Sequence, residues 1–144
     1  MKFSHTLKTS ASSEQIWAIW TDVEHWSVWD TELVDSHLKS AFVLGAVGKL
    51  TPKAGRVSPF IISQIDSGNS YTLTLKLPLC KLNIYRHLYR QSDSTYFTHE
   101  VSFKGILAFL FGLLLGRRFR IILPSVMENI KRIAEIQEPG SPAT

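Results

Sequence analysis

The last third of the chain carries a long helical pattern of apolar residues, and this pattern constrains the fold more than any other segment. Between Leu115 and Ala134 the apolar side chains recur three and four positions apart, with charged side chains between them. This spacing predicts an amphipathic helix with one wide buried face. Pro124 lies inside the pattern, where it removes a backbone hydrogen bond. We therefore expect a kinked helix or two abutting helices at residues 120–124.

Most of the preceding sequence alternates between apolar and polar residues, which is the period of half-buried β-strands. Ser12 and Gln15 interrupt this alternation as a predicted capping box for a short helix, and a second short helix ends near Trp29. Many strands followed by one long helix predict an α+β fold, with a six- to seven-stranded antiparallel sheet around the C-terminal helix. The strands are expected at residues 2–8, 32–38, 47–52, 56–66, 71–77, 82–90 and 95–104.

Length and composition favour a single domain over residues 1–137, followed by a disordered tail at residues 138–144. Cys80 is the only cysteine, so no internal disulfide is possible, and no signal-peptide pattern precedes the first strand. We therefore expect a cytoplasmic protein. The apolar run from Ile106 to Leu115 is about half the ~20 residues that a membrane span needs. A buried helix is its simpler interpretation, and an interfacial segment is the second.

Several function classes lack their sequence signals. The chain has no glycine-rich phosphate loop, no nucleophile elbow and no basic patch interleaved with aromatic residues, so nucleic acid is not an expected partner. No histidine spacing typical of a metal site occurs, and we expect neither a metal nor another cofactor. The net charge is a modest +4. Its one cluster, Arg117, Arg118 and Arg120, is interpreted as a solvated helix face that could attract an acidic group.

Short motifs follow one another in a characteristic order over residues 1–137. They are Ser12–Trp17, His25-Trp26 with Trp29-Asp30, Phe42 with Gly45 and Gly48, Tyr85 with His87, Thr98–Val101 with Phe103 and Gly105, and Leu123-Pro124 with Met127. In order and spacing they resemble the START-like (SRPBCC) superfamily with the Bet v 1-like helix-grip fold, and within it the polyketide cyclase/dehydrase and lipid-transport group. The resemblance implies a curved sheet gripping the C-terminal helix, with a hydrophobic cavity between them. It does not imply one reaction.

Histidines are the candidate polar groups of this cavity. Alternation places His5 and His99 on inward faces of the first and seventh strands, which the resemblance makes neighbours of the sixth. On the sixth strand either the face with Arg86 or the face with Tyr85 and His87 points inward; the family pattern favours the second. Three inward imidazoles could orient a ligand or act as general acid or base, could bind a metal, or could be separate packed side chains.

The resemblance implies a ligand site lined mainly by aromatic and aliphatic side chains. The first hypothesis is binding or transport of a small hydrophobic molecule, such as a lipid, a polyketide-like compound or a quinone, by a monomer or homodimer. The second is a cyclase or dehydratase-like enzyme with His87 or His99 as catalytic residue. The third is a protein that rests its Ile106–Leu115 surface on a membrane or on a second subunit. The expected ligand-binding residues are Trp26, Trp29, Phe60, Leu75, Tyr85, His87, His99, Val101, Phe103, Phe119 and Leu123.

Overall fold

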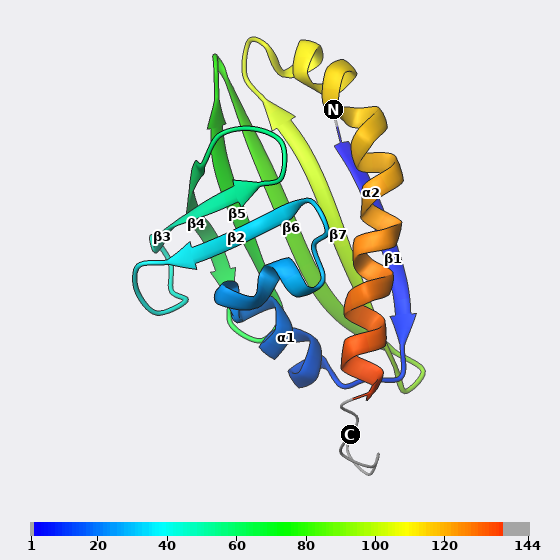
Figure 1. Ribbon diagram of the computed structural model, residues 1–144. Helices are drawn as coiled ribbons and strands as arrows, with labels where there is room; N and C mark the ends of the chain where they lie inside the picture. Colours follow the sequence, from blue (N-terminus) through cyan, green and yellow to red (C-terminus); the bar gives the residue numbers. More distant parts are fainter. Residues whose placement is uncertain (1, 137–144) are drawn as a thin grey trace.

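A computed structural model describes residues 2–136, in which a seven-stranded sheet partly encloses a long helix (Figure 1). All seven strands occur where the alternation predicts them, and the expected tail at residues 138–144 lies outside the described residues. In chain order the elements are β1 (Lys2–Thr9), α1 (Ser13–Thr21), η1 (Val23–Val28), β2 (Leu33–Leu38), β3 (Val47–Pro52), β4 (Ser58–Asp66), β5 (Ser70–Leu77), β6 (Cys80–Gln91), β7 (Ser94–Lys104) and α2 (Ala108–Ile136).

The sheet is antiparallel throughout and has the strand order β1-β7-β6-β5-β4-β3-β2. The chain thus returns from β7 to pair with β1, so the first, seventh and sixth strands are neighbours, as expected. In Figure 1, α2 runs along β1 and β7, while α1 and η1 close one end of the sheet. The α+β helix-grip architecture predicted from the sequence is confirmed.

The helix starts follow local sequence rules. The Ser12 hydroxyl accepts a hydrogen bond from the Gln15 backbone N–H, and the Gln15 side chain accepts one from the Ser12 N–H. This capping box satisfies two donors that the first turn of α1 would otherwise leave unpaired. After Asp22 the chain continues as η1, a 3₁₀ helix, which is the second short helix expected between β1 and β2.

The long helix α2 continues through Pro124 without interruption, so two abutting helices is the wrong alternative. Its buried stripe includes Leu123, Val126, Met127 and Ile130, and passes Pro124 on both sides. Packing of an amphipathic face supplies most of the stability of a protein helix. Because the buried stripe is continuous through Pro124, its packing offsets the backbone hydrogen bond that the proline removes.

The first turns of α2 differ from the rest of the helix. Ile106, Phe109 and Leu114 are 83%, 68% and 65% exposed, and Leu110 and Leu113 are exposed as well. The expected buried helix is therefore correct for one face of the run alone. Gly112 is buried and Leu107, Phe111 and Leu115 pack against the core, while the opposite face is exposed. No helix within residues 2–136 has the length and apolarity required to cross a bilayer.

Candidate functional site

A row of polar side chains crosses the inner face of the sheet. His5 on β1 is paired with His99 on β7, His99 with Arg86 on β6, and Arg86 with Tyr71 on β5. His99, Arg86 and Tyr71 are buried, and His5 is half-buried. Four adjacent strands of the sheet thus place a hydroxyl, a guanidinium and two imidazoles in one row across its inner face.

The face of β6 that points inward is the one with Arg86, which corrects the choice made from the family pattern. Arg86 and Leu88 are buried, whereas Tyr85 and His87 alternate with them and lie on the outer face. There Tyr85 and His87 stack with ring centroids 5.0 Å apart, and the stack continues to Tyr89. Leu82 and Leu88 share the face of Arg86 and are buried with it, so this face of β6 packs into the core.

Arg86 lies in an aromatic cage at the centre of this row. Its guanidinium carbon is 5.2 Å from the ring centroid of Trp26, 5.1 Å from that of Trp29 and 5.6 Å from that of Tyr71. One terminal nitrogen donates a hydrogen bond to the Tyr71 hydroxyl at 2.5 Å. The Nε atom is buried and has no hydrogen-bond partner within the described part of the chain. Cation–π contacts therefore replace part of the hydration of this charge, but its donors are not all satisfied.

Asp30 is the nearby negative charge. Burial raises the pKa of its carboxyl, while the backbone N–H of Glu32, which donates to its Oδ1, and the positive charge of Arg86 oppose this rise. No ion pair joins the two side chains in residues 2–136, so Asp30 balances Arg86 from a distance. Burial raises the pKa of Tyr71 too, so the phenol remains protonated beside Arg86 at neutral pH.

His99 is a neutral acceptor. The indole Nε1 of Trp20 donates a hydrogen bond to Nε2 of His99 at 3.1 Å. Burial lowers the pKa of His99 well below its usual value, and the positive charge of Arg86 lowers it further. With Nε2 accepting, the single proton of the neutral ring is assigned to Nδ1. His99 therefore matches the interpretation of a packed histidine with its own partner.

Comparison with solved structures supports the architecture at low sequence identity. Protein MLL2253 from Mesorhizobium loti gives a TM-score of 0.75 at 13% identity, over 96% of this chain and all of that chain. Norcoclaurine synthase from Thalictrum flavum, in complex with dopamine and hydroxybenzaldehyde, gives 0.73 at 11% identity, over 96% of this chain and 88% of that chain. The di-domain ARO/CYC StfQ from the steffimycin biosynthetic pathway gives 0.73 at 10% identity, over 93% of this chain and 50% of that chain.

The chain has the helix-grip fold of these structures. No family model and no curated protein sequence matches it. Identities of 10–13% establish the fold alone, so the role of each residue has to be argued from the geometry of this chain.

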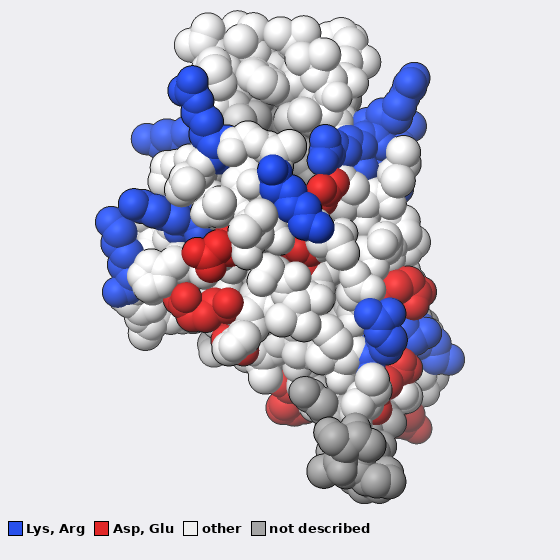
Figure 2. All heavy atoms as spheres, viewed as in Figure 1, with Lys and Arg blue, Asp and Glu red and all other residues white. Residues whose placement is uncertain are grey.

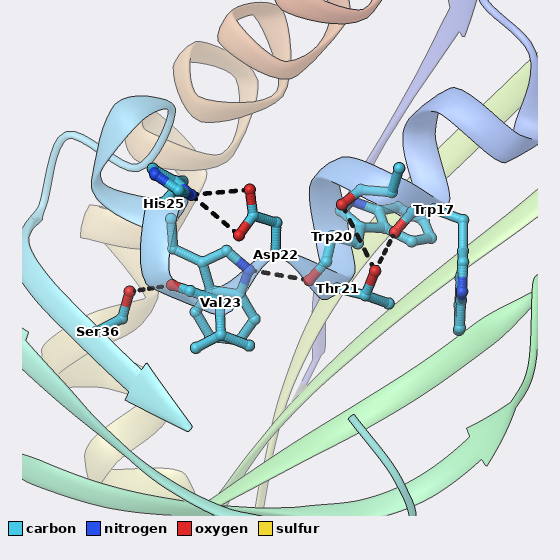
Figure 3. A network of polar contacts seen from close by, with 9 residues as sticks. Trp17, Trp20, Thr21, Asp22, Val23, His25 and Ser36 are labelled. Carbon is cyan, nitrogen blue, oxygen red and sulfur yellow. Dashed lines mark hydrogen bonds and ion pairs between the residues drawn. The ribbon is translucent and has the colours of Figure 1, made fainter. Parts of the chain in front are cut away.

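The junction of α1 and η1 positions the indoles of the interior (Figure 3). The Trp26 indole Nε1 donates to the backbone carbonyl of Trp20 at 2.9 Å. At the same turn the Asp22 carboxylate contacts the His25 ring, and the Ser36 hydroxyl donates to the Val23 carbonyl. These contacts connect β2 and η1 to the end of α1. They fix the positions from which Trp20 and Trp26 pack against the sheet.

The other expected site residues pack against one another in the interior. The Trp26 ring stacks on Phe60 at 5.6 Å, and the Phe103 ring lies 6.1 Å from Phe119. Only Tyr85 and His87 of the expected set point away. The inward members are Trp26, Trp29, Phe60, Leu75, His99, Val101, Phe103, Phe119 and Leu123.

Neither Arg86 nor the Tyr71 hydroxyl was among the polar groups expected to contact a ligand. A signal for both existed, because Arg86 alternates in phase with Leu82, Ile84 and Leu88, and Tyr71 in phase with Leu73. No group of three or more histidine, cysteine, aspartate or glutamate side chains within residues 2–136 is placed to hold a metal ion. The positive charge of Arg86 in the middle of the polar row would also repel a metal ion.

Proposed function

We propose that the protein binds a small amphiphilic molecule, with an apolar body and an acidic head, between the inner face of the sheet and α2. The observation that carries the proposal is the buried Arg86 guanidinium with its unpartnered Nε. Arginine stays charged in proteins, and a buried charge without its full set of acceptors lowers stability. Unsatisfied buried groups of this kind call for a functional reason, and an anionic ligand head supplies one.

The chemistry of Arg86 selects among the ligand classes expected from the sequence. A guanidinium binds a carboxylate through two parallel N–H···O bonds, whereas a quinone offers single neutral carbonyls. A fatty acid or a polyketide-like acid therefore fits better than a quinone. The Tyr71 hydroxyl can donate to the same head, because the hydrogen bond from Arg86 uses it as an acceptor. Arg86 thus replaces Tyr85 and His87 in the orienting role.

Access to Arg86 would open at the β2–β3 loop. Phe42 on this loop covers Tyr71 edge-on, with ring centroids 4.9 Å apart, and also contacts Trp17. Its neighbours Val43 and Leu44 are exposed. Swinging Phe42 outward would uncover Tyr71 and, behind it, Arg86. The complex of norcoclaurine synthase with dopamine and hydroxybenzaldehyde supports small-molecule binding by a protein of this fold.

The test compares two probes of equal chain length, dodecanoic acid and dodecanol. Trp26 and Trp29 flank Arg86, so their fluorescence reports occupancy of the site. We expect the acid to bind at least about tenfold more tightly than the alcohol. Arg86→Met should abolish this preference while leaving alcohol binding similar.

Arg90→Met is the matched control, because Arg90 lies on the same strand but is exposed. It should retain the preference for the acid. Circular dichroism of both variants checks that they fold. Equal affinity of the wild-type protein for acid and alcohol would refute the proposal, and that comparison does not depend on any variant.

The enzymatic alternative has weaker support. His99 is 1% exposed and its Nε2 already accepts a hydrogen bond, so neither ring position meets the needs of a general base near neutral pH. His87 lies outside the interior altogether. A ligand that is recovered chemically unchanged from the wild-type complex, by mass spectrometry, would favour the carrier over the enzyme.

A further inference from the structure

An apolar tip with a basic border forms the end of the molecule where α2 begins. We use the name apolar tip for Leu79, Ile106, Phe109, Leu110, Leu113 and Leu114, all of them exposed. Figure 2 shows this end as an uncharged surface, with lysine and arginine side chains on both sides just below it. From this arrangement we propose that the apolar tip inserts into the surface of a lipid bilayer that carries anionic headgroups.

The two chain segments of the apolar tip are fixed side by side. The Leu107 N–H donates to the Leu79 carbonyl at 3.1 Å, joining the start of α2 to the β5–β6 turn. Gly105 has φ +127°, and a Cβ there would lie 2.6 Å from the same carbonyl oxygen. Leu79 itself adopts φ +52° and is 67% exposed. The left-handed backbone conformation is unfavourable for leucine, and so is the exposure of its apolar side chain to water. Leu79 therefore does not stabilise the fold, which indicates a role in binding.

Three lysines lie directly below the tip. Lys76 is paired with Lys81 across β5 and β6, and Lys81 with Lys104 across β6 and β7. Together with Leu77, Leu79 and Ile106 they line a hollow of about 600 Å³. Like charges directly opposite one another destabilise a sheet, and the stretches 67–92 and 101–127 contain no acidic residue to offset them. The row of lysines is therefore complementary to an anionic surface.

Arginines continue this border along α2. Arg117 is exposed and has no partner in the described residues, while Arg118 contacts Glu32 at 2.9 Å. The guanidinium of Arg120 lies 5.1 Å from the centroid of Phe3. Aromatic and leucine side chains at a tip, with lysine and arginine one or two turns behind, are the composition of segments that bind in the interfacial layer of a bilayer.

A second copy of the chain fits this surface less well. In a symmetric dimer each patch meets itself, so Lys76, Lys81, Lys104 and Arg117 would face the same residues of the partner. No acidic side chain of stretches 67–92 or 101–127 would pair with them. An apolar contact between two tips would thus bring like charges together, whereas anionic lipids would neutralise them.

The first experiment measures co-sedimentation of the full chain with vesicles. Vesicles of phosphatidylcholine alone are compared with vesicles containing about one quarter phosphatidylserine. We expect binding to the anionic vesicles that weakens as salt rises from about 0.1 M to about 0.5 M. Equal binding to both compositions, or no binding to either, would overturn the proposal.

Matched variants separate the tip from general surface effects. Phe109→Ser with Leu113→Ser should reduce binding about tenfold or more, since both side chains are exposed and lose only lipid contacts. The control is Ile121→Ser with Ile136→Ser. These two isoleucines are also exposed on α2, but they lie too far along the helix from the apolar tip to reach the bilayer. A similar loss in the control would contradict a role for the apolar tip.

Charge reversal tests the lysine row in the same way. Lys81→Glu with Lys104→Glu should abolish the preference for phosphatidylserine, whereas Lys8→Glu with Lys49→Glu, which changes the net charge equally, should retain it. Light scattering of the free protein gives its mass over a range of concentrations. A dimer that the Phe109 and Leu113 variant dissociates would assign the apolar tip to self-association and refute the membrane proposal.

Discussion

The Trp20 indole N–H donates a hydrogen bond to Nε2 of His99 across 3.1 Å, and this bond joins α1 to β7. Both side chains are buried, so neither can exchange the bond for one to solvent. Protonation of Nε2 would turn the acceptor into a donor and would place two N–H groups against each other. The interior therefore requires the neutral imidazole, in agreement with the lowered pKa of His99.

The first prediction follows from this requirement and concerns stability in acid. In the unfolded chain His99 titrates near its usual pKa of 6.5, whereas in the folded protein its pKa is far lower. Between these two values the unfolded state binds the extra proton, so the free energy of unfolding falls as pH falls below about 6.5. From about pH 7.5 to about pH 5.5 we expect a loss of about 1 kcal/mol from this group, measured by urea unfolding.

Two variants isolate the contribution of His99. His99→Gln keeps an acceptor for Trp20 but does not titrate, so its stability should fall less over the same pH interval. His25→Gln removes an exposed histidine whose pKa Asp22 raises. Because such a group adds stability as pH falls, this variant should lose at least as much stability in acid as the wild-type protein. If His99→Gln lost as much stability as the wild type, His99 would not be the titrating group.

The strands and α2 could be predicted from the sequence because their patterns depend on local periods. Residues 71–77 alternate strictly, and the helical stripe before and after Pro124 keeps one register. The exposed start of α2 could not be predicted in this way. Whether an apolar run is buried depends on where the sheet ends, and that boundary is set by the strand lengths and the turn at Leu79.

The interior site was predicted only in part, for a reason that β6 illustrates. Its two faces carry similar apolar area, one with Leu82 and Leu88 and the other with Tyr85 and Tyr89. The difference is Arg86, which the inward face can accept only because the Trp26, Trp29 and Tyr71 rings surround its charge. Those rings come from distant segments, so no local pattern reveals that a buried arginine has partners.

The second prediction concerns the coupling of Arg86 and Asp30. Removing either charge leaves the other without its opposite charge, and Arg86 is buried while Asp30 is half-buried. Arg86→Met and Asp30→Asn should therefore both destabilise the protein at neutral pH. The double variant removes both charges and should be more stable than the sum of the single effects implies. We expect a coupling energy between about 0.5 and 3 kcal/mol from urea unfolding of the four proteins. Strict additivity would show that Asp30 does not balance Arg86.

The third prediction concerns the approach of α2 to β1. A Cβ at Gly116 would lie 2.2 Å from the Phe3 ring, which packs edge-on against Phe103. Alanine is normally the better helix former by about 1 kcal/mol, but here Gly116→Ala should destabilise by about 1–3 kcal/mol through overpacking. In a Phe3→Ala background the ring is gone, and the same substitution should become neutral or stabilising. A destabilisation that persists in that background would contradict the contact.

The fourth prediction concerns the glycine that lies against the β5–β6 turn at the apolar tip. Gly105 has φ +127° and Gly68 has φ +84°, and a Cβ at Gly68 meets no atom within 4 Å, whereas one at Gly105 clashes with the Leu79 carbonyl. Gly68→Ala should therefore cost only the backbone strain, about 1–2 kcal/mol, and Gly105→Ala should cost clearly more. Thermal unfolding of the two variants gives the comparison.

Because the Leu79 carbonyl also accepts the Leu107 N–H, Gly105→Ala should in addition speed amide exchange at Leu107, and Gly68→Ala should leave that rate unchanged. Equal costs for the two variants would mean that the β5–β6 turn and the start of α2 are not held together as a single tip.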